Sequence, residues 1–267
     1  MKYILFLLLF HSYLLALINE PIQTEVKSVS LEEESVLIHP VTGAQVGMYG
    51  VIVHHFNAKH ATALSWVEIT AISSDGLSAK MLPIYALEQS ALPSGTWKAQ
   101  AGDEVILGYN YHRSLLIAPN PSVYKKVTEH HKDLKWVHPD IFTTVLSTRG
   151  HPTPLADDFK YTCRANNIGL VSFMFDQSLL TIDCQSFKIL QNKETSFKID
   201  ETQLPFYTRV VNIEENWFGE GSEPLTEYTP YYVALLAENN PDNEWIQNYL
   251  KTLEETQESD SWFSSWF

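Results

Sequence analysis

The run Tyr49-Gly50-Val51-Ile52-Val53, followed by Ser65-Trp66-Val67-Glu68-Ile69, decides the expected fold of the N-terminal half of this 267-residue chain. Both runs are rich in β-branched and aromatic residues, and the second alternates apolar and polar side chains as a half-buried strand does. Turn residues such as Gly102-Asp103 separate them from similar runs at 35–38, 79–84, 104–108 and 114–118. Short strands at this spacing predict a small β-barrel or sandwich of the SH3-like kind over residues 18–120.

Beyond Pro119-Asn120-Pro121 the spacing of apolar residues becomes that of helices. Ser122 is the expected N-cap of the first helix, and Gly150 the expected C-terminal stop of the second. We expect helices over 123–131, 140–146 and 155–164, and strands over 134–137, 169–175, 179–184 and 187–190. Residues 121–213 therefore read as a mixed α/β unit, which makes the whole chain α+β.

The last region, residues 214–267, is expected to be an acidic segment with an amphipathic helix. A strand is expected just before it, over 206–211. Asn240-Pro241-Asp242-Asn243-Glu244 is typical of a helix start, with Pro241 at the first helical position. The residues after it that share one face are Trp245, Ile246, Tyr249, Leu250 and Leu253. This stripe is expected to pack on the body, with docking of a partner helix as the alternative.

Negative charge is concentrated at the C-terminal end of the chain. Residues 214–267 hold twelve acidic residues and one basic residue, Lys251, whereas the formal net charge of the whole chain is -14. Without a basic stripe there is little to displace counterions from phosphates, so nucleic acid is not an expected partner. The bland interpretation of the acidic segment is a solvated, solubilising surface.

The first residues predict export. Lys2 precedes the apolar run 4–10, which is followed by Tyr13-Leu14-Leu15-Ala16-Leu17 and then by the polar pair Asn19-Glu20. This order is typical of a signal peptide, here residues 1–17, and a retained anchor is the alternative. We expect an exported protein of the periplasm or of the outer-membrane-associated cell surface.

Cys163 and Cys184 are the only cysteines. An even cysteine count in an oxidising compartment favours a disulfide. Two buried free thiols, or a metal or redox pair, remain as alternatives.

Signatures of common enzymes are missing from the sequence. It contains no Gly-x-Ser-x-Gly elbow, no Walker loop and no His-Glu-x-x-His. Its ten histidines offer ligands for a metal, but His130 and His131 also suit the end of a helix, where positive charge is favourable. We expect a non-enzyme with no cofactor and no metal, and keep an uncharacterised periplasmic enzyme as an alternative.

A set of short sequence motifs, taken in order, carries a resemblance to a known family. The motifs are Val46-Gly47 with Gly50, Gly102-Asp103, Leu116-Ile117-Ala118-Pro119-Asn120, Cys163, Cys184-Gln185-Ser186-Phe187-Lys188-Ile189-Leu190 and Leu204-Pro205-Phe206-Tyr207-Thr208-Arg209-Val210. In this order they resemble the N-terminal domain of the plasminogen-binding surface proteins of Gram-negative bacteria. The resemblance runs from about Val36 to Tyr232.

The resemblance implies an exported envelope protein that binds host plasminogen and has no catalytic residues to transfer. Plasminogen kringles recognise a lysine side chain together with a carboxylate. Family members continue into a Lys- and Glu-rich tail, whereas this sequence ends at Phe267 after an acidic segment. We therefore expect weak, lysine-competed binding through internal lysines such as Lys125, Lys126 or Lys251. A periplasmic structural or assembly factor that docks another envelope protein is the alternative.

Four aromatic residues, Trp262, Phe263, Trp266 and Phe267, crowd together at the end of the sequence. Exposed large aromatics suit a partner's pocket or a lipid interface. We expect them to hold the protein to a partner or to the membrane surface. The alternatives are that this segment extends the preceding helix over the body or is disordered.

Overall fold

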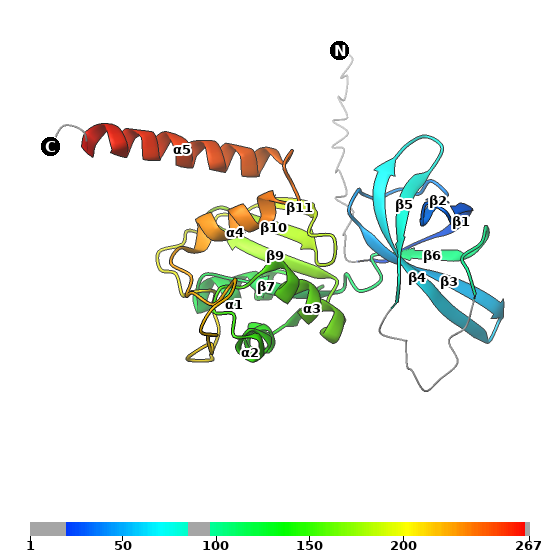
Figure 1. Ribbon diagram of the computed structural model, residues 1–267, viewed down its shortest axis with the longest axis horizontal. Helices are drawn as coiled ribbons and strands as arrows, with labels where there is room; N and C mark the ends of the chain where they lie inside the picture. The colour runs from blue at the N-terminus through cyan, green and yellow to red at the C-terminus, as the bar shows by residue number, and fades with distance from the viewer. Residues whose placement is uncertain (1–19, 85–96, 265–267) are drawn as a thin grey trace, which may run out of the picture.

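A β-barrel and a mixed sheet covered by helices make up the protein, seen here in a computed structural model (Figure 1). The structure describes residues 20–84 and 97–264. The expected signal peptide, residues 1–17, lies outside the described residues. The predicted α+β class, with an N-terminal barrel, is confirmed.

The barrel consists of six antiparallel strands in the closed order β1-β2-β5-β4-β3-β6. Their bounds are β1 Ile22–Ser30, β2 Ser35–Ile38, β3 Tyr49–Asn57, β4 His60–Ile72, β5 Leu77–Leu82 and β6 Glu104–Leu107. Alternate residues of each strand, among them Val36 and Ile38 of β2 and Val67 and Ile69 of β4, fill the interior. The strand that sequence reasoning missed is β1, which pairs with both β2 and β6 and so closes the barrel.

The second sheet has five strands in the order β11-β10-β9-β7-β8. They are β7 Arg113–Ile117, β8 Lys135–Val137, β9 Leu170–Phe175, β10 Ser178–Asp183 and β11 Ile189–Glu194. Strand β7 runs parallel to both β8 and β9, and the remaining pairs are antiparallel. The run at 114–118 was expected in the barrel, and this was wrong. Its Ser114-Leu115-Leu116-Ile117 stretch is buried on both faces, as a central strand of a helix-covered sheet requires.

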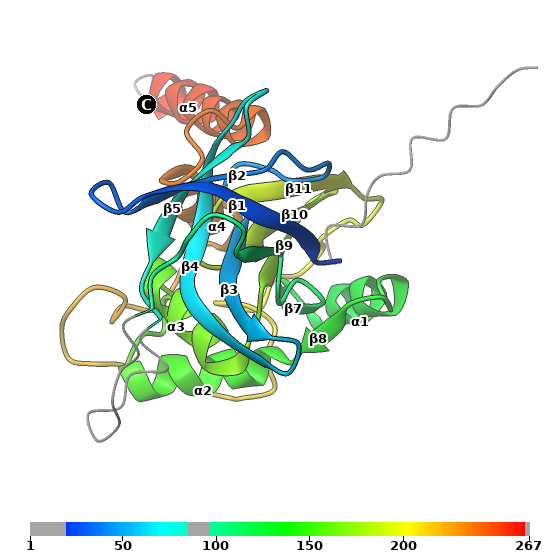
Figure 2. The same ribbon diagram turned by 90° about the vertical axis from the view of Figure 1, so that its right-hand side faces the viewer.

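Helices cover both faces of this sheet (Figure 2). They are α1 Pro121–His130, α2 Pro139–Arg149, α3 Ala156–Asn166 and α4 Tyr228–Ala237. On one face, Leu115 and Ile117 of β7 pack with α2, α3 and α4. On the other, Leu116 and Ala118 pack with Val123 of α1. The chain thus leaves β7 and β8 toward opposite faces of the sheet.

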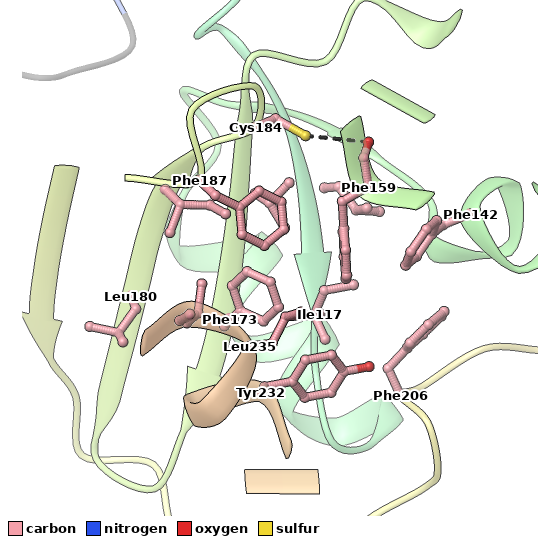
Figure 3. Close-up of a cluster of buried hydrophobic side chains, with 14 of the residues drawn as sticks. Ile117, Phe142, Phe159, Phe173, Leu180, Cys184, Phe187, Phe206, Tyr232 and Leu235 are labelled. Atoms are coloured by element: carbon pink, nitrogen blue, oxygen red, sulfur yellow. Dashed lines mark hydrogen bonds between the residues drawn. The ribbon is translucent and has the colours of Figure 1, made fainter. Parts of the chain in front are cut away.

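The main core lies between the sheet and helices α2 to α4 (Figure 3). Its aromatic rings pack closely: the centroids of Phe142 and Phe159 are 4.3 Å apart, and Phe142 stacks on Phe206 at 5.4 Å. Tyr232 contributes its ring to the core and donates its hydroxyl hydrogen to the carbonyl of Pro205 at 3.0 Å. A buried hydroxyl with a partner avoids the cost of an unsatisfied polar group.

Helix ends follow local capping rules, although not always at the expected residue. Asn120, rather than Ser122, caps α1, because its side-chain oxygen accepts a hydrogen bond from the Val123 amide at 2.9 Å. Gly150 ends α2 as predicted, with φ 68° in the left-handed region that glycine adopts without strain.

The C-terminal region differs most from the expectation. The expected strand over 206–211 is wrong, because this segment is irregular and crosses the N-terminal end of α2. Helix α4 was missed. Helix α5, Glu244–Ser264, begins three residues after Pro241, with the Asn243 side chain accepting from the Ile246 amide at 3.1 Å.

Four of the five residues of the expected stripe of α5 pack against the core, as predicted: Trp245, Ile246, Tyr249 and Leu250. The helix then continues away from the body (Figure 1). Within the described residues, no helix is both long and apolar enough to cross a membrane.

Candidate partner-binding site

The barrel and the second sheet are joined by a buried carboxylate. Asp183, at the end of β10, accepts a hydrogen bond from the Tyr111 hydroxyl at 2.6 Å and from the Tyr49 amide at 3.3 Å. Its other oxygen accepts from the amides of Gln185 and Ser186 at 2.8 and 2.9 Å. Burial raises the pKa of Asp183 to about 6, against the opposing effect of these donors. Tyr49 opens β3, so this node fixes the barrel on the sheet.

A second contact across the junction explains why position 47, in one of the motifs that carry the family resemblance, is a glycine. Gly47, with φ 89°, accepts a hydrogen bond from the Ser186 hydroxyl at 2.6 Å. A Cβ atom at this position would lie 2.2 Å from Cβ of Lys188. Only glycine therefore fits, in both conformation and space. Gly47 and Ser186, which belong to the motifs of the resemblance, thus hold the two parts together here.

Cys163 of α3 and Cys184, directly after β10, form a disulfide with Cα atoms 6.4 Å apart. Both residues are buried in the main core. The bridge ties α3 to the turn that also carries Ser186. Its place beside the junction gives it a structural role.

The segment that contains Tyr207, Thr208 and Arg209 crosses the carboxyl ends of β7 and β8. The Tyr207 amide donates to the Ala118 carbonyl at 2.7 Å, and Asp140 accepts from both the Thr208 hydroxyl and the Arg209 guanidinium, at 2.9 and 2.7 Å. Bonds from the backbone and side chain of Arg209 and from Thr208 outweigh desolvation and lower the pKa of Asp140. In many α/β proteins a ligand occupies this edge, where the connections diverge. Here the chain's own segment lies across it.

The predicted lysines lie on the surface of two different helices. Lys125 and Lys126 are exposed on α1, and Lys251 is exposed on α5. The Lys125 ammonium lies 3.9 Å from the Glu129 carboxylate, one turn further along α1, and these side chains are 75% and 60% exposed. The Lys126 ammonium lies 5.9 Å above the ring of Phe197. Lys125 therefore presents an accessible cation with a carboxylate beside it.

The predicted aromatic tail is only partly described. Trp262 and Phe263 fall in the last turns of α5, and Trp266 and Phe267 lie outside the described residues. The backbone there is helical, as in the alternative that extends the preceding helix. The docking role of the tail stays a prediction.

Three of the histidines contact carboxylates or a helix end within the fold. His54 pairs with Asp103 at 2.6 Å and His151 with Asp158 at 3.0 Å, while His138 caps α2. Across residues 20–84 and 97–264, no three histidine, cysteine, aspartate or glutamate side chains gather as a metal site.

Sequence reasoning missed the most exposed aromatics of the described chain. Trp217 and Phe218, in the loop between β11 and α4, are 98% and 86% exposed. The signal for them was a Trp-Phe pair flanked by glutamates and glycines, which reads as a turn. Periodicity cannot reveal an aromatic pair that belongs to no helix or strand.

Comparison with known proteins gives a consistent result. A family model described as "Plasminogen-binding protein pgbA N-terminal" matches residues 21–236. Two curated proteins, both named plasminogen-binding protein PgbA, come from Helicobacter pylori strains J99 and 26695. Each is 27% identical over 222 residues, which cover 82% of this chain and 48% of the relative. The chain thus spans about half the length of the curated relatives it matches. No solved structure gives a significant match.

Proposed function

The chain belongs to the plasminogen-binding protein PgbA N-terminal family, and we propose that it is an exported envelope protein that acts by binding plasminogen. Family membership supports a binding role, since the curated relatives are named for binding plasminogen. The exposed pair of Lys125 and Glu129 is the reason for placing the plasminogen-binding surface on α1. Kringles take a lysine ammonium together with a carboxylate, and α1 presents both on one face.

Helix α1 is a suitable carrier for such a pair. Its N-terminus is fixed by the Asn120 cap, and Val123 and Val127 anchor its inner face in a small core under the sheet. The two charged side chains are one turn apart on the outer face. An exposed ion pair contributes about 0–1 kcal/mol, so a partner can open it at low cost.

Binding of plasminogen to immobilised protein tests the proposal. We expect Lys125→Gln to weaken binding about tenfold, because one charge-assisted contact is lost. Lys126→Gln and Lys251→Gln rank the other two lysines. Lys59→Gln, an exposed lysine on the barrel, is the matched control and is expected to leave affinity unchanged within about twofold. Binding that ε-aminocaproate does not displace, or that survives loss of all three lysines, would refute the kringle mechanism.

Export is tested separately from binding. Protease shaving of intact cells, followed by fractionation, should remove the protein from the outer surface if it meets plasminogen there. Complete protection in intact cells, with cleavage only after the outer membrane is opened, would place it in the periplasm. That outcome would favour an envelope assembly factor over capture of a host protein.

A further inference from the structure

The loop that carries Trp217 and Phe218 is fixed at its first end on helix α2. The Asn216 amide donates to the Gly150 carbonyl at 3.1 Å, and its side chain donates to the Arg149 carbonyl at 2.8 Å. A Cβ atom on Gly150 would lie 2.3 Å from the Asn216 side chain. The residue directly before Trp217 is therefore seated closely against the end of α2.

The second end of the loop is fixed on the segment that leads into α3. The Thr153 amide donates to the Gly221 carbonyl at 3.1 Å, and its hydroxyl donates to the Glu223 carbonyl at 2.6 Å. Between the anchors, the Ser222 hydroxyl donates to the Gly219 carbonyl at 2.6 Å and closes a turn. Both ends and the turn are thus held by hydrogen bonds.

The fixed loop nevertheless buries almost none of its two large aromatic side chains, since Trp217 is 98% and Phe218 is 86% exposed. Single exposed apolar residues are normal on a protein surface. Two adjacent aromatic residues on an anchored loop instead form an exposed apolar surface that is suited to contact with a partner. Tryptophan at the centre of an interface is among the residues that contribute most to binding. Because the loop is already ordered, association loses little conformational entropy there.

Charge identifies the kind of partner. Glu214, Glu215, Glu220 and Glu223 surround the two aromatics in sequence, and residues 210–227 contain no lysine or arginine. A carboxylate rim repels anionic lipid headgroups and attracts a basic protein surface. We infer that the Trp217–Phe218 loop docks a protein partner whose surface has an apolar pocket bordered by lysine and arginine. This interface is separate from the α1 lysines and does not rest on plasminogen binding.

Site-specific crosslinking in producing cells is the first part of the test. The photo-crosslinking amino acid p-benzoylphenylalanine is placed at position 217 and, as the matched control, at position 97, where Trp97 on the barrel is 62% exposed. We expect one adduct from position 217 that position 97 does not give. The adduct should disappear when Glu214→Gln, Glu215→Gln, Glu220→Gln and Glu223→Gln are combined. No adduct at 217, the same adduct at 97, or an adduct that resists neutralisation would overturn the inference.

The second part measures affinity with the purified protein identified in that adduct. Trp217→Ala should weaken binding at least tenfold, Trp97→Ala should not, and higher salt should weaken binding further because the rim is charged. Plasminogen binding by Trp217→Ala should remain at the wild-type level. Equal affinity of the two variants, or a lowered melting temperature of Trp217→Ala, would show that the loop is not a docking element. Loss of binding to phosphatidylglycerol vesicles in Trp217→Ala would assign it to a membrane surface instead.

Discussion

At the residue scale, the motifs that carry the family resemblance have mainly structural roles. Asn120 caps α1, Ser186 reaches the backbone of Gly47, and Arg209 pairs with Asp140. The sequence could not assign partners to Ser186 and Arg209, because Gly47 and Asp140 lie far from them in the chain. These motifs predicted the family correctly, but they do not indicate which surface of the protein binds a partner.

Asp183 gives the residue-scale prediction of pH dependence. Its folded pKa of about 6 lies above the ordinary value of 3.8, so its contribution to stability is complete below about pH 4 and is lost as pH rises through 6. We expect wild-type protein to lose on the order of 2–3 kcal/mol of unfolding free energy between pH 4 and 7 from this group. Asp183→Asn should be less stable overall but should lack this loss.

Urea unfolding of both proteins at a series of pH values measures the difference. The direct comparison removes the effects of other titrating groups, which the two proteins share. Identical pH profiles for wild type and Asp183→Asn would contradict the assignment of this titration to Asp183.

The disulfide between Cys163 and Cys184 gives a second residue-scale prediction. A closed loop of this length stabilises a fold by about 3 kcal/mol in the chain-entropy model, so replacing both cysteines with alanine should lower the unfolding free energy by that order. Urea unfolding measures it, and wild-type protein in reductant provides the comparison. Two alkylatable thiols in native, unreduced protein would rule the bridge out.

At the element scale, the sequence predicted most strands and amphipathic helices, but it missed the apolar helix α4 and wrongly predicted a strand over 206–211. Strand β2 was predicted over the residues it occupies, and α2 ends at Gly150 as expected. Helix α4 was missed because it is apolar on all sides, with Tyr228, Tyr232 and Leu235 all buried, and so shows no amphipathic stripe. Residues 206–211 have the composition of a strand, but contacts with α2 and β7 determine their path.

The cap of α1 gives an element-scale prediction with a control beside it. Asn120→Ala removes the bond to the Val123 amide and a second bond to the Glu201 carbonyl. We expect a loss of about 1 kcal/mol of unfolding free energy, whereas Ser122→Ala, two residues on, should change it by less than about 0.5 kcal/mol. Chemical denaturation of the two variants measures the difference, and the reverse order would restore Ser122 as the cap.

At the scale of the whole molecule, the barrel and the second sheet share part of one core. Leu170 of β9 and Leu190 of β11 pack with Tyr111 in the barrel cluster. The α+β class and the barrel followed from the strand spacing, but the assignment of β7 to the second sheet did not. Its run follows the barrel strands at a similar spacing, yet it pairs with β8 and β9. The exposure of the Trp217 loop could not be predicted from the sequence either, because exposure depends on how the rest of the chain packs.

The candidate contact surfaces lie apart from the junction between the barrel and the second sheet. Asp183 and the Gly47–Ser186 contact lie inside the molecule, whereas Lys125 on α1 and Trp217 in its loop face outward. Variants at the surface should therefore change binding without changing stability, and variants at the junction should do the reverse.

Lysine footprinting tests the central claim, that plasminogen is bound through the lysines of α1, most directly. The protein is acetylated for short times alone and in complex with plasminogen, and mass spectrometry gives the rate at each lysine. We predict that the acetylation rate of Lys125 falls several-fold in the complex, that the rate of Lys59 on the barrel does not change, and that ε-aminocaproate restores the rate of Lys125. A complex that forms while Lys125 and Lys126 keep their free rates would contradict the claim.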